Sequence, residues 1–336
     1  MKKPTLIDVA QEAGVSPITV SRTLRQPDLV SEAMRLKVAA AVKKLNYVPD
    51  SAAATLASNR SNIIGMLIPS FSNSVFADVL AGAYEAAKDT RFNIQIGNMQ
   101  YNQQMEEAQL ASFLSVKPAG LIISGIDQTP YSKALLTQAQ CPVVQVMDLS
   151  DQPFDMIVGF SNADATTQAL EHMIGQGFKK IGFVAARMDL RTQRRMMTYR
   201  EVMQSHGLLD ERLIVTTPEP SSAELGRKLF NQLLNNVPEC DAGFFSNDDL
   251  AVGASFECQR KGIRIPQDFG ICGFNDLGTT SQIYPEITSV HTPRFEVGKT
   301  AVEMILAAQK EPLSNEARIV DLGFELKVRA STLITH

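Results

Sequence analysis

Hydrophobic and polar positions follow two different spacings from residue 62 to the end of the chain. Short, continuous apolar runs alternate with longer stretches in which apolar residues recur every three or four positions, as they do in helices. The runs expected as strands are 63–68, 93–97, 120–124, 142–148, 156–160, 180–185, 213–217, 242–246, 269–274 and 288–292. The stretches expected as helices include 74–88, 104–115, 163–176, 192–206, 222–235, 249–261 and 295–309. This alternation predicts an α/β fold with two doubly wound lobes, each a parallel sheet of about five strands with helices on both faces. In such folds a ligand binds at the carboxyl ends of the strands.

The first 48 residues have a different pattern, in which helical spacing is not interrupted by strands. The spacing of apolar residues predicts helices at 6–13, 17–24 and 32–45. Thr5 is expected to cap the first helix and Ser16 the second, which begins with Pro17. Val20 and Leu24 are expected to point inward. Two short helices across a tight turn, followed by a longer helix, form a helix-turn-helix, whose second helix would enter the major groove of DNA.

The charge of the chain is divided unevenly. Residues 1–60 contain nine Lys and Arg residues and five acidic residues, a net charge of +4, whereas the remaining residues carry a net charge of −8. A basic head on an acidic body suggests that the head binds a polyanion. A solvated basic face is the alternative, and charge alone does not decide between them. The side chains expected at DNA phosphates are Ser16, Thr19 and Ser21, and those expected at base edges are Pro17, Ile18 and Arg22. A short helical hairpin in a larger bundle is the alternative interpretation.

Residues 50–58 form an alanine-rich segment in which Leu56 is the one large apolar residue. Eight helical residues span roughly 12 Å, and an isolated helix shorter than about 12–15 residues is marginal in water. We therefore expect this segment to be helical only when it packs against something.

Composition and the remaining motifs exclude several classes of protein. The 336 residues are 44% hydrophobic and 20% charged, which is typical of a soluble protein with more than one domain. No apolar stretch is long enough to span a membrane, and the first residues lack the apolar core of a signal peptide, so a cytoplasmic protein is expected. Cysteines and histidines are scattered, without the spacing of a metal site, and neither a metal nor a cofactor is expected. Nucleotide-binding and hydrolase motifs are absent, and the acidic pair Asp248-Asp249 is interpreted as a helix start with Asp248 as its N-cap.

Several motifs of the first 58 residues resemble the DNA-binding head of the lactose/galactose-repressor family. They are Asp8-Val9-Ala10, Ala13-Gly14-Val15-Ser16, Thr19-Val20-Ser21-Arg22, Leu45-Asn46-Tyr47-Val48-Pro49 and Leu56-Ala57. The resemblance continues through the body, which is similar to periplasmic sugar-binding proteins. It implies a helix-turn-helix domain at 1–48, a hinge helix and linker at 49–61, and an effector-binding and dimerisation body at 62–336. The two lobes of that body would be about 62–161 with 293–322, and about 162–290 with 323–336.

The resemblance also implies how the hinge would work. In the family this helix pairs with its dimer mate in the minor groove, where the leucine at Leu56 wedges between two central base pairs, and apolar wedges of this kind kink the duplex. Ala53 and Ala57 are small enough to let the two hinge helices approach each other, and Thr5 is counted with these residues among the DNA contacts. No leucine-heptad tail follows the last expected strand, so a homodimer is expected.

An arginine-rich stretch, 185–203, follows one of the expected strands. Arg187 and Arg191 are expected in the loop after this strand. Arg194 and Arg195 are expected in the first turns of the next helix. Guanidinium groups at such a position can bind a carboxylate or a phosphate. A solvated basic face is the alternative for each single arginine, but the position of the cluster at the expected cleft favours an anionic ligand.

The resemblance adds further effector contacts. Arg195 matches the family's effector-binding arginine, so its loss is expected to remove most of the preference for an anion. Asn275 stands where many members have an aspartate that binds sugar hydroxyls, which disfavours a neutral aldose. The other expected contacts are Ser70, Asn73, Phe76, Asp148, Arg187, Arg191, Asn247 and Thr292. Phe76 could equally be a core residue, and Asp148 or Thr292 could serve only to hold a crossover between the lobes.

Four strings in the body resemble the gluconate-repressor branch of the family, which senses sugar acids. They are VMDLSDQPFDMIVGFSN, SNDDLAVGASFECQR, VHTPRFEVG and VDLGF. The sequence therefore predicts a repressor of a sugar-acid operon, bound to a pseudo-palindromic operator and released by a sugar acid or its phosphate. A regulator that senses a neutral sugar or acts with a co-repressor is the alternative. The head and hinge argue against a sugar-binding module without DNA function, and the absence of enzyme motifs argues against an α/β enzyme.

Overall fold

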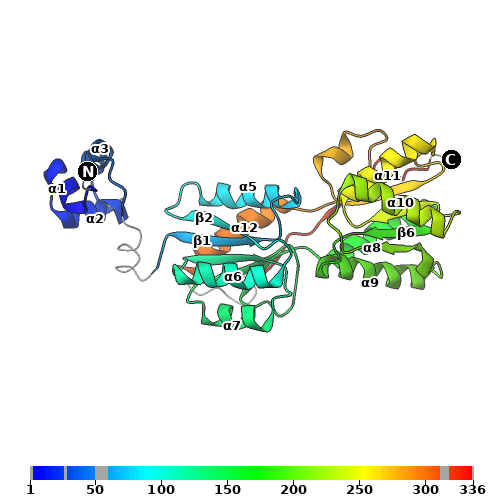
Figure 1. Cartoon of the computed structure of the whole chain (residues 1–336), viewed down its shortest axis with the longest axis horizontal. Helices are drawn as coiled ribbons and strands as arrows, with labels where there is room; N and C mark the ends of the chain where they lie inside the picture. Colours follow the sequence, from blue (N-terminus) through cyan, green and yellow to red (C-terminus); the bar gives the residue numbers. More distant parts are fainter. Residues whose placement is uncertain (1–2, 26–28, 50–59, 311–317, 335–336) are drawn as a thin grey trace. The chain divides into compact units, whose positions relative to one another are not determined.

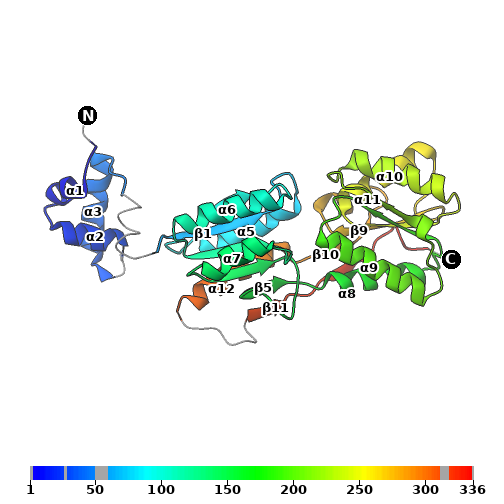
Figure 2. The same cartoon turned by 60° about the horizontal axis from the view of Figure 1, so that its bottom comes forward.

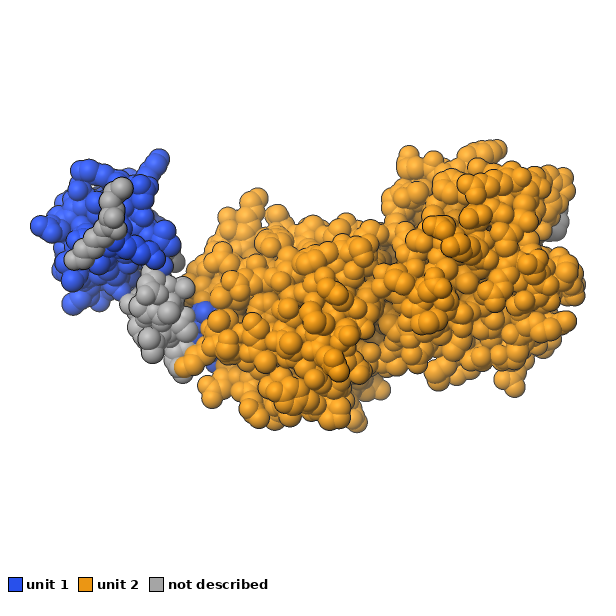
Figure 3. Space-filling view, in the orientation of Figure 1, with its two compact units in different colours: residues 1–61 blue, residues 62–336 orange. Residues whose placement is uncertain are grey.

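The computed structural model describes residues 3–25, 29–49, 60–310 and 318–334. The chain forms two compact units, residues 1–61 and residues 62–336 (Figure 3). The segment expected as the hinge helix, with Ala53, Leu56 and Ala57, lies outside the described residues.

The described residues of unit 1 form a helical bundle (Figure 1). The helices are α1 (Leu6–Ala13), α2 (Pro17–Arg25) and α3 (Glu32–Leu45). Val9, Val20 and Val38 contribute one buried side chain from each helix to the shared core. The expectation that Leu24 points inward is wrong, because its side chain is 36% exposed while Thr23 is buried. The buried face of α2 therefore includes Val20 and Thr23, which are three positions apart. The Thr23 hydroxyl donates a hydrogen bond to the Thr19 carbonyl at 2.8 Å, so it is satisfied although it is buried.

The first sheet of unit 2 is fully parallel, with the strand order β11-β5-β4-β3-β1-β2. Its strands are β1 (Ile63–Ile68), β2 (Asn93–Asn98), β3 (Gly120–Ser124), β4 (Val143–Val146), β5 (Met156–Gly159) and β11 (Ile319–Asp321). The helices are α5 (Val75–Ala87), α6 (Gln103–Ser115), α7 (Pro130–Gln138) and α12 (Arg294–Ala308). Met66 packs in the core with α5 and α12, whereas its neighbour Leu67 packs with α6 and α7. Successive residues of a strand point to opposite faces, so the sheet buries both of them.

The second sheet has the same arrangement, with the order β12-β10-β9-β8-β6-β7. Its strands are β6 (Ile181–Ala185), β7 (Ile214–Thr216), β8 (Ala242–Phe245), β9 (Gly270–Asn275), β10 (Thr288–His291) and β12 (Glu325–Lys327). The helices are α8 (Asn162–Gly175), α9 (Leu190–Ser205), α10 (Ala223–Asn236) and α11 (Asp248–Lys261). Phe244 lies in one core with Tyr199 of α9, and the adjacent Phe245 lies in the other core with α10 and α11. One edge departs from the expected parallel sheet, because β12 pairs with β10 in the antiparallel direction.

The chain passes between the two sheets three times, after β5, after β10 and after β11 (Figure 2). Both sheets therefore belong to one unit, and neither is built from a continuous segment. A loop follows the carboxyl end of β1, β2 and β4 in the first sheet, and of β6, β8 and β9 in the second.

Each sheet is covered on one face by two helices whose backbones approach closely at glycines. In the first lobe, a Cβ atom on Gly298 of α12 would lie 1.8 Å from the Val79 carbonyl oxygen, and one on Gly82 of α5 would lie 1.9 Å from that of Phe295. In the second lobe, a Cβ atom on Gly253 of α11 would lie 2.0 Å from the Ala223 carbonyl oxygen. Only glycine leaves room for these contacts.

Candidate functional site

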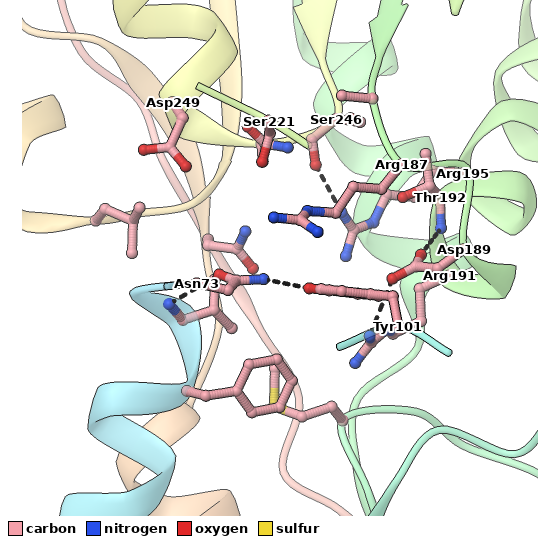
Figure 4. Close-up of a pocket in the computed structure, with 17 residues that line it drawn as sticks. Asn73, Tyr101, Arg187, Asp189, Arg191, Thr192, Arg195, Ser221, Ser246 and Asp249 are labelled. Carbon is pink, nitrogen blue, oxygen red and sulfur yellow. Dashed lines mark hydrogen bonds and ion pairs between the residues drawn. The ribbon is translucent and has the colours of Figure 1, made fainter. Parts of the chain in front are cut away.

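The loops at the carboxyl ends of both sheets surround one cavity in unit 2 (Figure 4). The space between its walls is about 590 Å³, a volume that includes open solvent at its mouth. The residues that line it are Asn73, Val75, Phe76, Tyr101, Met147, Ala186, Arg187, Asp189, Arg191, Thr192, Arg195, Ser221, Ser246, Asn247, Asp249, Asn275 and Leu277. Twelve of these 17 residues are polar or charged, among them three arginines and two aspartates. Seven of the ten side chains expected to contact an effector are in this set.

Arg191 lies in the first turn of α9, not in the loop where the sequence placed it. Asp189 caps this helix by accepting a hydrogen bond from the Thr192 amide at 2.9 Å, and its carboxylate also pairs with the Arg191 guanidinium at 3.0 Å. Burial alone would raise the pKa of Asp189, but Arg191 and the Thr192 amide lower it to about 2. Arg191 also donates to the Ser124 hydroxyl at the end of β3, at 3.1 Å, so it connects the two lobes.

Arg195 is buried one turn further along α9, with 7% of its surface exposed. Its Nε and one terminal nitrogen donate to the Asn162 side-chain oxygen at 3.1 and 2.8 Å, and the other terminal nitrogen donates to the Ser246 carbonyl at 2.6 Å. The guanidinium carbon lies 3.6 Å from the centroid of the Phe274 ring. Burial lowers the pKa of Arg195 to about 10, so the side chain remains a cation at neutral pH.

Arg187 occupies the loop between β6 and α9. Its φ of 65° and the φ of 51° at Met188 place two consecutive non-glycine residues in the left-handed region. Such conformations cost on the order of 1–3 kcal/mol each and are concentrated at functional sites. The guanidinium carbon lies 4.3 Å from the centroid of the Tyr101 ring, and the Tyr101 hydroxyl accepts a hydrogen bond from Asn73 at 2.7 Å (Figure 4).

Two asparagines complete the wall from the second lobe. Asn247 is the N-cap of α11 and accepts a hydrogen bond from the Leu250 amide at 3.2 Å. The expectation that Asp248 caps this helix is therefore wrong. Asp248 is the first helical residue, and it is buried where it accepts hydrogen bonds from the Ser289 hydroxyl and the Leu277 amide. Asn275 has a φ of 102°, and its backbone carbonyl accepts a hydrogen bond from Arg294.

Three expected effector contacts do not line the cavity. Asp148 pairs with Arg194 at 2.7 Å, which connects the end of β4 to α9. Thr292 accepts a hydrogen bond from Arg294 at 3.3 Å, and the Ser70 hydroxyl bonds to that of Ser72 at 2.8 Å. Because the structure gives these three polar side chains protein partners, their direct contact with an effector stays a prediction from sequence.

Six polar residues of the wall were not among the expected contacts. They are Tyr101, Asp189, Thr192, Ser221, Ser246 and Asp249. Asp189 had a detectable signal, since an acidic residue between a strand and a helix is a typical N-cap. Burial raises the pKa of Asp249, while the nearby Arg187 lowers it. No group of three or more His, Cys, Asp or Glu residues in the described part of the chain is placed to hold a metal ion.

The exposed side of α2 in unit 1 is a second candidate site. Pro17, Ile18 and Arg22 are exposed there, and Ile18 is 73% exposed even though it is apolar. The Ser16 hydroxyl accepts a hydrogen bond from the Thr19 amide at 3.2 Å, as expected for a helix cap, and it also bonds to the Thr19 hydroxyl at 2.9 Å.

Two further residues, Ser21 and Thr5, were expected to contact DNA. Ser21 is half-buried on α2. Thr5 forms a reciprocal capping box with Asp8, so the structure gives it a clear local role, and its contact with DNA stays a prediction. None of the helices in the described ranges has both the length and the apolar character needed to cross a membrane.

Comparisons with known proteins cover both units. Residues 5–50 match the family described as bacterial regulatory proteins, lacI family, and residues 170–332 match the periplasmic binding protein-like domain. The chain is 38% identical to the HTH-type transcriptional regulator GntR of Pseudomonas aeruginosa. The matched 332 residues are 98% of this chain and 96% of the relative. The crystal structure of a LacI-family transcriptional regulator from Silicibacter pomeroyi is 33% identical, with a TM-score of 0.89 over 98% of this chain and 99% of that one. The lac repressor dimer bound to operator and the anti-inducer ONPF is 26% identical, with a TM-score of 0.83 over 99% of this chain and 100% of that one.

Proposed function

The chain belongs to the lacI family of bacterial regulatory proteins, and from this membership we propose that it represses a sugar-acid operon and leaves its operator when a sugar acid binds. The cavity of unit 2 would be the effector site, and the exposed face of α2 would read the operator. We place this regulator in the cytoplasm as a homodimer, in which each protomer contacts one half of a pseudo-palindromic site.

One observation supports an anionic effector above the others. Arg187, Arg191 and Arg195 line a single cavity, and the acidic side chains of its wall are Asp189 and Asp249. Three cations against two carboxylates leave an excess of one positive charge in a partly buried space. Asn275 adds an amide where an aspartate would add a negative charge. A monocarboxylate such as gluconate balances this excess, whereas a neutral sugar does not.

The position of the site between the lobes suggests how binding could reach the DNA. Side chains from both lobes line the cavity, and Arg191 and Arg194 already connect them through Ser124 and Asp148. An effector that binds one arrangement of the lobes more tightly shifts the population toward that arrangement. We propose that this shift separates the paired hinge helices of the dimer, which are too short to stay helical alone.

Release of operator DNA by effectors tests the function directly. The operator is first selected from random duplexes with the full-length protein, and binding is then followed by fluorescence anisotropy at fixed salt, because phosphate contacts are strongly salt-dependent. Gluconate is expected to release the operator at concentrations at which glucose has no effect. If glucose is equally effective, the effector is a neutral sugar. If the acid strengthens binding, it is a co-repressor, and if no sequence is selected, DNA regulation is the wrong function.

Arg22 is expected to recognise a base rather than a phosphate, because its side chain is exposed on α2, the helix expected to enter the major groove. Arg22→Ala is expected to cost about 1–3 kcal/mol of operator affinity if the side chain binds a guanine in the major groove. The same loss on a scrambled duplex would show that Arg22 contacts phosphate instead. Lys37 on α3 offers a control substitution that removes the same charge from another helix.

Leu56 is expected to wedge into the minor groove. Leu56→Ala is expected to weaken operator binding and DNA bending while leaving gluconate affinity nearly unchanged, because the leucine is remote in sequence from the residues of the cavity. Bending is measured by energy transfer between dyes at the two duplex ends. A variant that bends the operator as strongly as the parent would rule out the wedge.

A further inference from the structure

The arginines around the cavity differ in how far the protein already satisfies them. Arg191 is paired with Asp189 and bonded to Ser124, and Arg194 is paired with Asp148. Arg195 uses its Nε and both terminal nitrogens to hold a side chain and a backbone carbonyl of the wall. These three guanidinium groups therefore have structural partners, and their first contribution is to shape the cavity.

Arg187 is different. Its Nε is buried and has no hydrogen-bond partner in the described part of the chain, and the same is true of the Ser246 hydroxyl on the same wall. A buried donor without a partner is costly, so a ligand atom that accepts from it is favoured. Figure 4 shows the Arg187 side chain extending toward the centre of the cavity, beside the ring of Tyr101.

The contact with Tyr101 does not satisfy the hydrogen-bond donors of Arg187. The guanidinium carbon lies over the Tyr101 ring, 4.3 Å from its centroid, and this cation–π contact uses none of the N–H groups as hydrogen-bond donors. Asn73 holds the Tyr101 hydroxyl at 2.7 Å, so the ring itself is fixed from the first lobe. The ring contact thus helps to hold the guanidinium in place and leaves its Nε without a hydrogen-bond partner among the described residues.

The backbone supports the same interpretation. Arg187 and Met188 both have positive φ, and the Arg187 amide donates to the Glu219 carbonyl at 3.0 Å, which holds the loop in this conformation. A glycine would adopt it without strain. A long charged side chain at this position directs a guanidinium into the cavity at the expense of backbone strain, as is common where a binding site is preorganised.

We propose that Arg187, rather than Arg195, binds the carboxylate of the effector and determines the preference for an acid over a polyol. This inference rests on the proposed function, since it presumes that the cavity takes a sugar acid. The Ser246 hydroxyl supplies a further donor in the same cavity. Arg195 then acts as a positioning residue that holds the wall through Asn162 and the Ser246 carbonyl.

Calorimetric titration of the full-length protein with gluconate and glucitol tests the proposal. Glucitol has the same carbon chain and hydroxyls, with a hydroxymethyl group in place of the carboxylate. Arg187→Gln is expected to weaken gluconate binding by roughly ten- to a hundredfold, the value of a charge-assisted hydrogen bond, and to leave glucitol affinity unchanged. Arg200→Gln is the matched control, because Arg200 lies on α9 outside the cavity and pairs with the exposed Glu211 at 2.9 Å.

A second variant separates binding from folding. Arg187→Gly removes the guanidinium and relieves the positive φ, so its melting temperature is expected to equal or exceed that of the parent while its gluconate affinity falls as in Arg187→Gln. If either variant keeps the preference for gluconate, or loses both ligands equally, Arg187 does not bind the carboxylate. If the parent itself binds glucitol as well as gluconate, the anionic effector is wrong, and the failure lies with the proposed function.

Discussion

Arg195→Ala is expected to destabilise the body and to weaken every ligand of the cavity. The substitution removes three hydrogen bonds and leaves the Asn162 side-chain oxygen and the Ser246 carbonyl without their donor in a buried site. Unsatisfied buried groups cost about 1–3 kcal/mol each, so a total loss of about 2–4 kcal/mol is expected after the relief of burying a cation. Scanning calorimetry of the full chain should show that the melting temperature of the body falls by roughly 5–12 °C.

Ligand binding distinguishes this effect from that of Arg187→Gln. Because Arg195 shapes the wall, Arg195→Ala is expected to weaken gluconate and glucitol by similar factors. Arg200→Ala, on the exposed face of the same helix, is the control and should change neither melting nor binding appreciably. A variant that retains stability and loses only the acid would make Arg195 the anion-binding residue, as the sequence alone suggested.

Gly298→Val is expected to prevent α12 from packing on α5. A Cβ atom at this position would lie 1.8 Å from the Val79 carbonyl oxygen. On the facing helix, a Cβ atom on Gly82 would lie 1.9 Å from the Phe295 carbonyl oxygen. Neither neighbour is a flexible side chain that could move aside, since both are helix backbone. Overpacking of a core typically costs about 1–3 kcal/mol and more where backbone must shift, so a loss of at least about 3 kcal/mol is expected.

Thermal or urea unfolding followed by circular dichroism measures this loss. Gly175→Ala is the control, because a Cβ atom on this helical glycine of α8 would have no neighbour within 4 Å. It is expected to be neutral or to stabilise slightly, since alanine favours helix more than glycine does. Equal unfolding midpoints for Gly298→Val and the parent would show that the two helices do not pack as closely as described.

The elements of the fold were largely predictable from sequence because their signals are local. Ile63–Ile68 and Ile181–Ala185 are short apolar runs between amphipathic stretches, and both are buried strands, as predicted. Thr5 and Ser16 were recognisable helix caps, since the hydroxyl and the amide that it satisfies are three residues apart. The antiparallel edge strand β12 carried no comparable signal, because only pairing with β10 makes its three residues a strand.

Two positions, Leu24 and the N-cap of α11, differ from the sequence-based predictions for physical reasons. Leu24 is apolar and lies near the buried face of α2, but the position of the other helices decides which residue at its end is covered. The N-cap of α11 is Asn247 rather than Asp248, because one residue of difference in where a helix begins moves the cap to the neighbouring side chain.

The basic helical head, the doubly wound body and the arginine cluster at the end of a strand were predictable from sequence, because spacing and charge express these features locally. The role of each arginine depends on contacts that exist only in the folded chain. Residues 124, 148, 162 and 246 lie 33–67 positions away from the arginines that they bind, and hydrogen-bond partners at such separations leave no pattern in one sequence. The same holds for Tyr101, which is 86 positions before Arg187 and whose ring centroid lies 4.3 Å from the guanidinium carbon of that arginine.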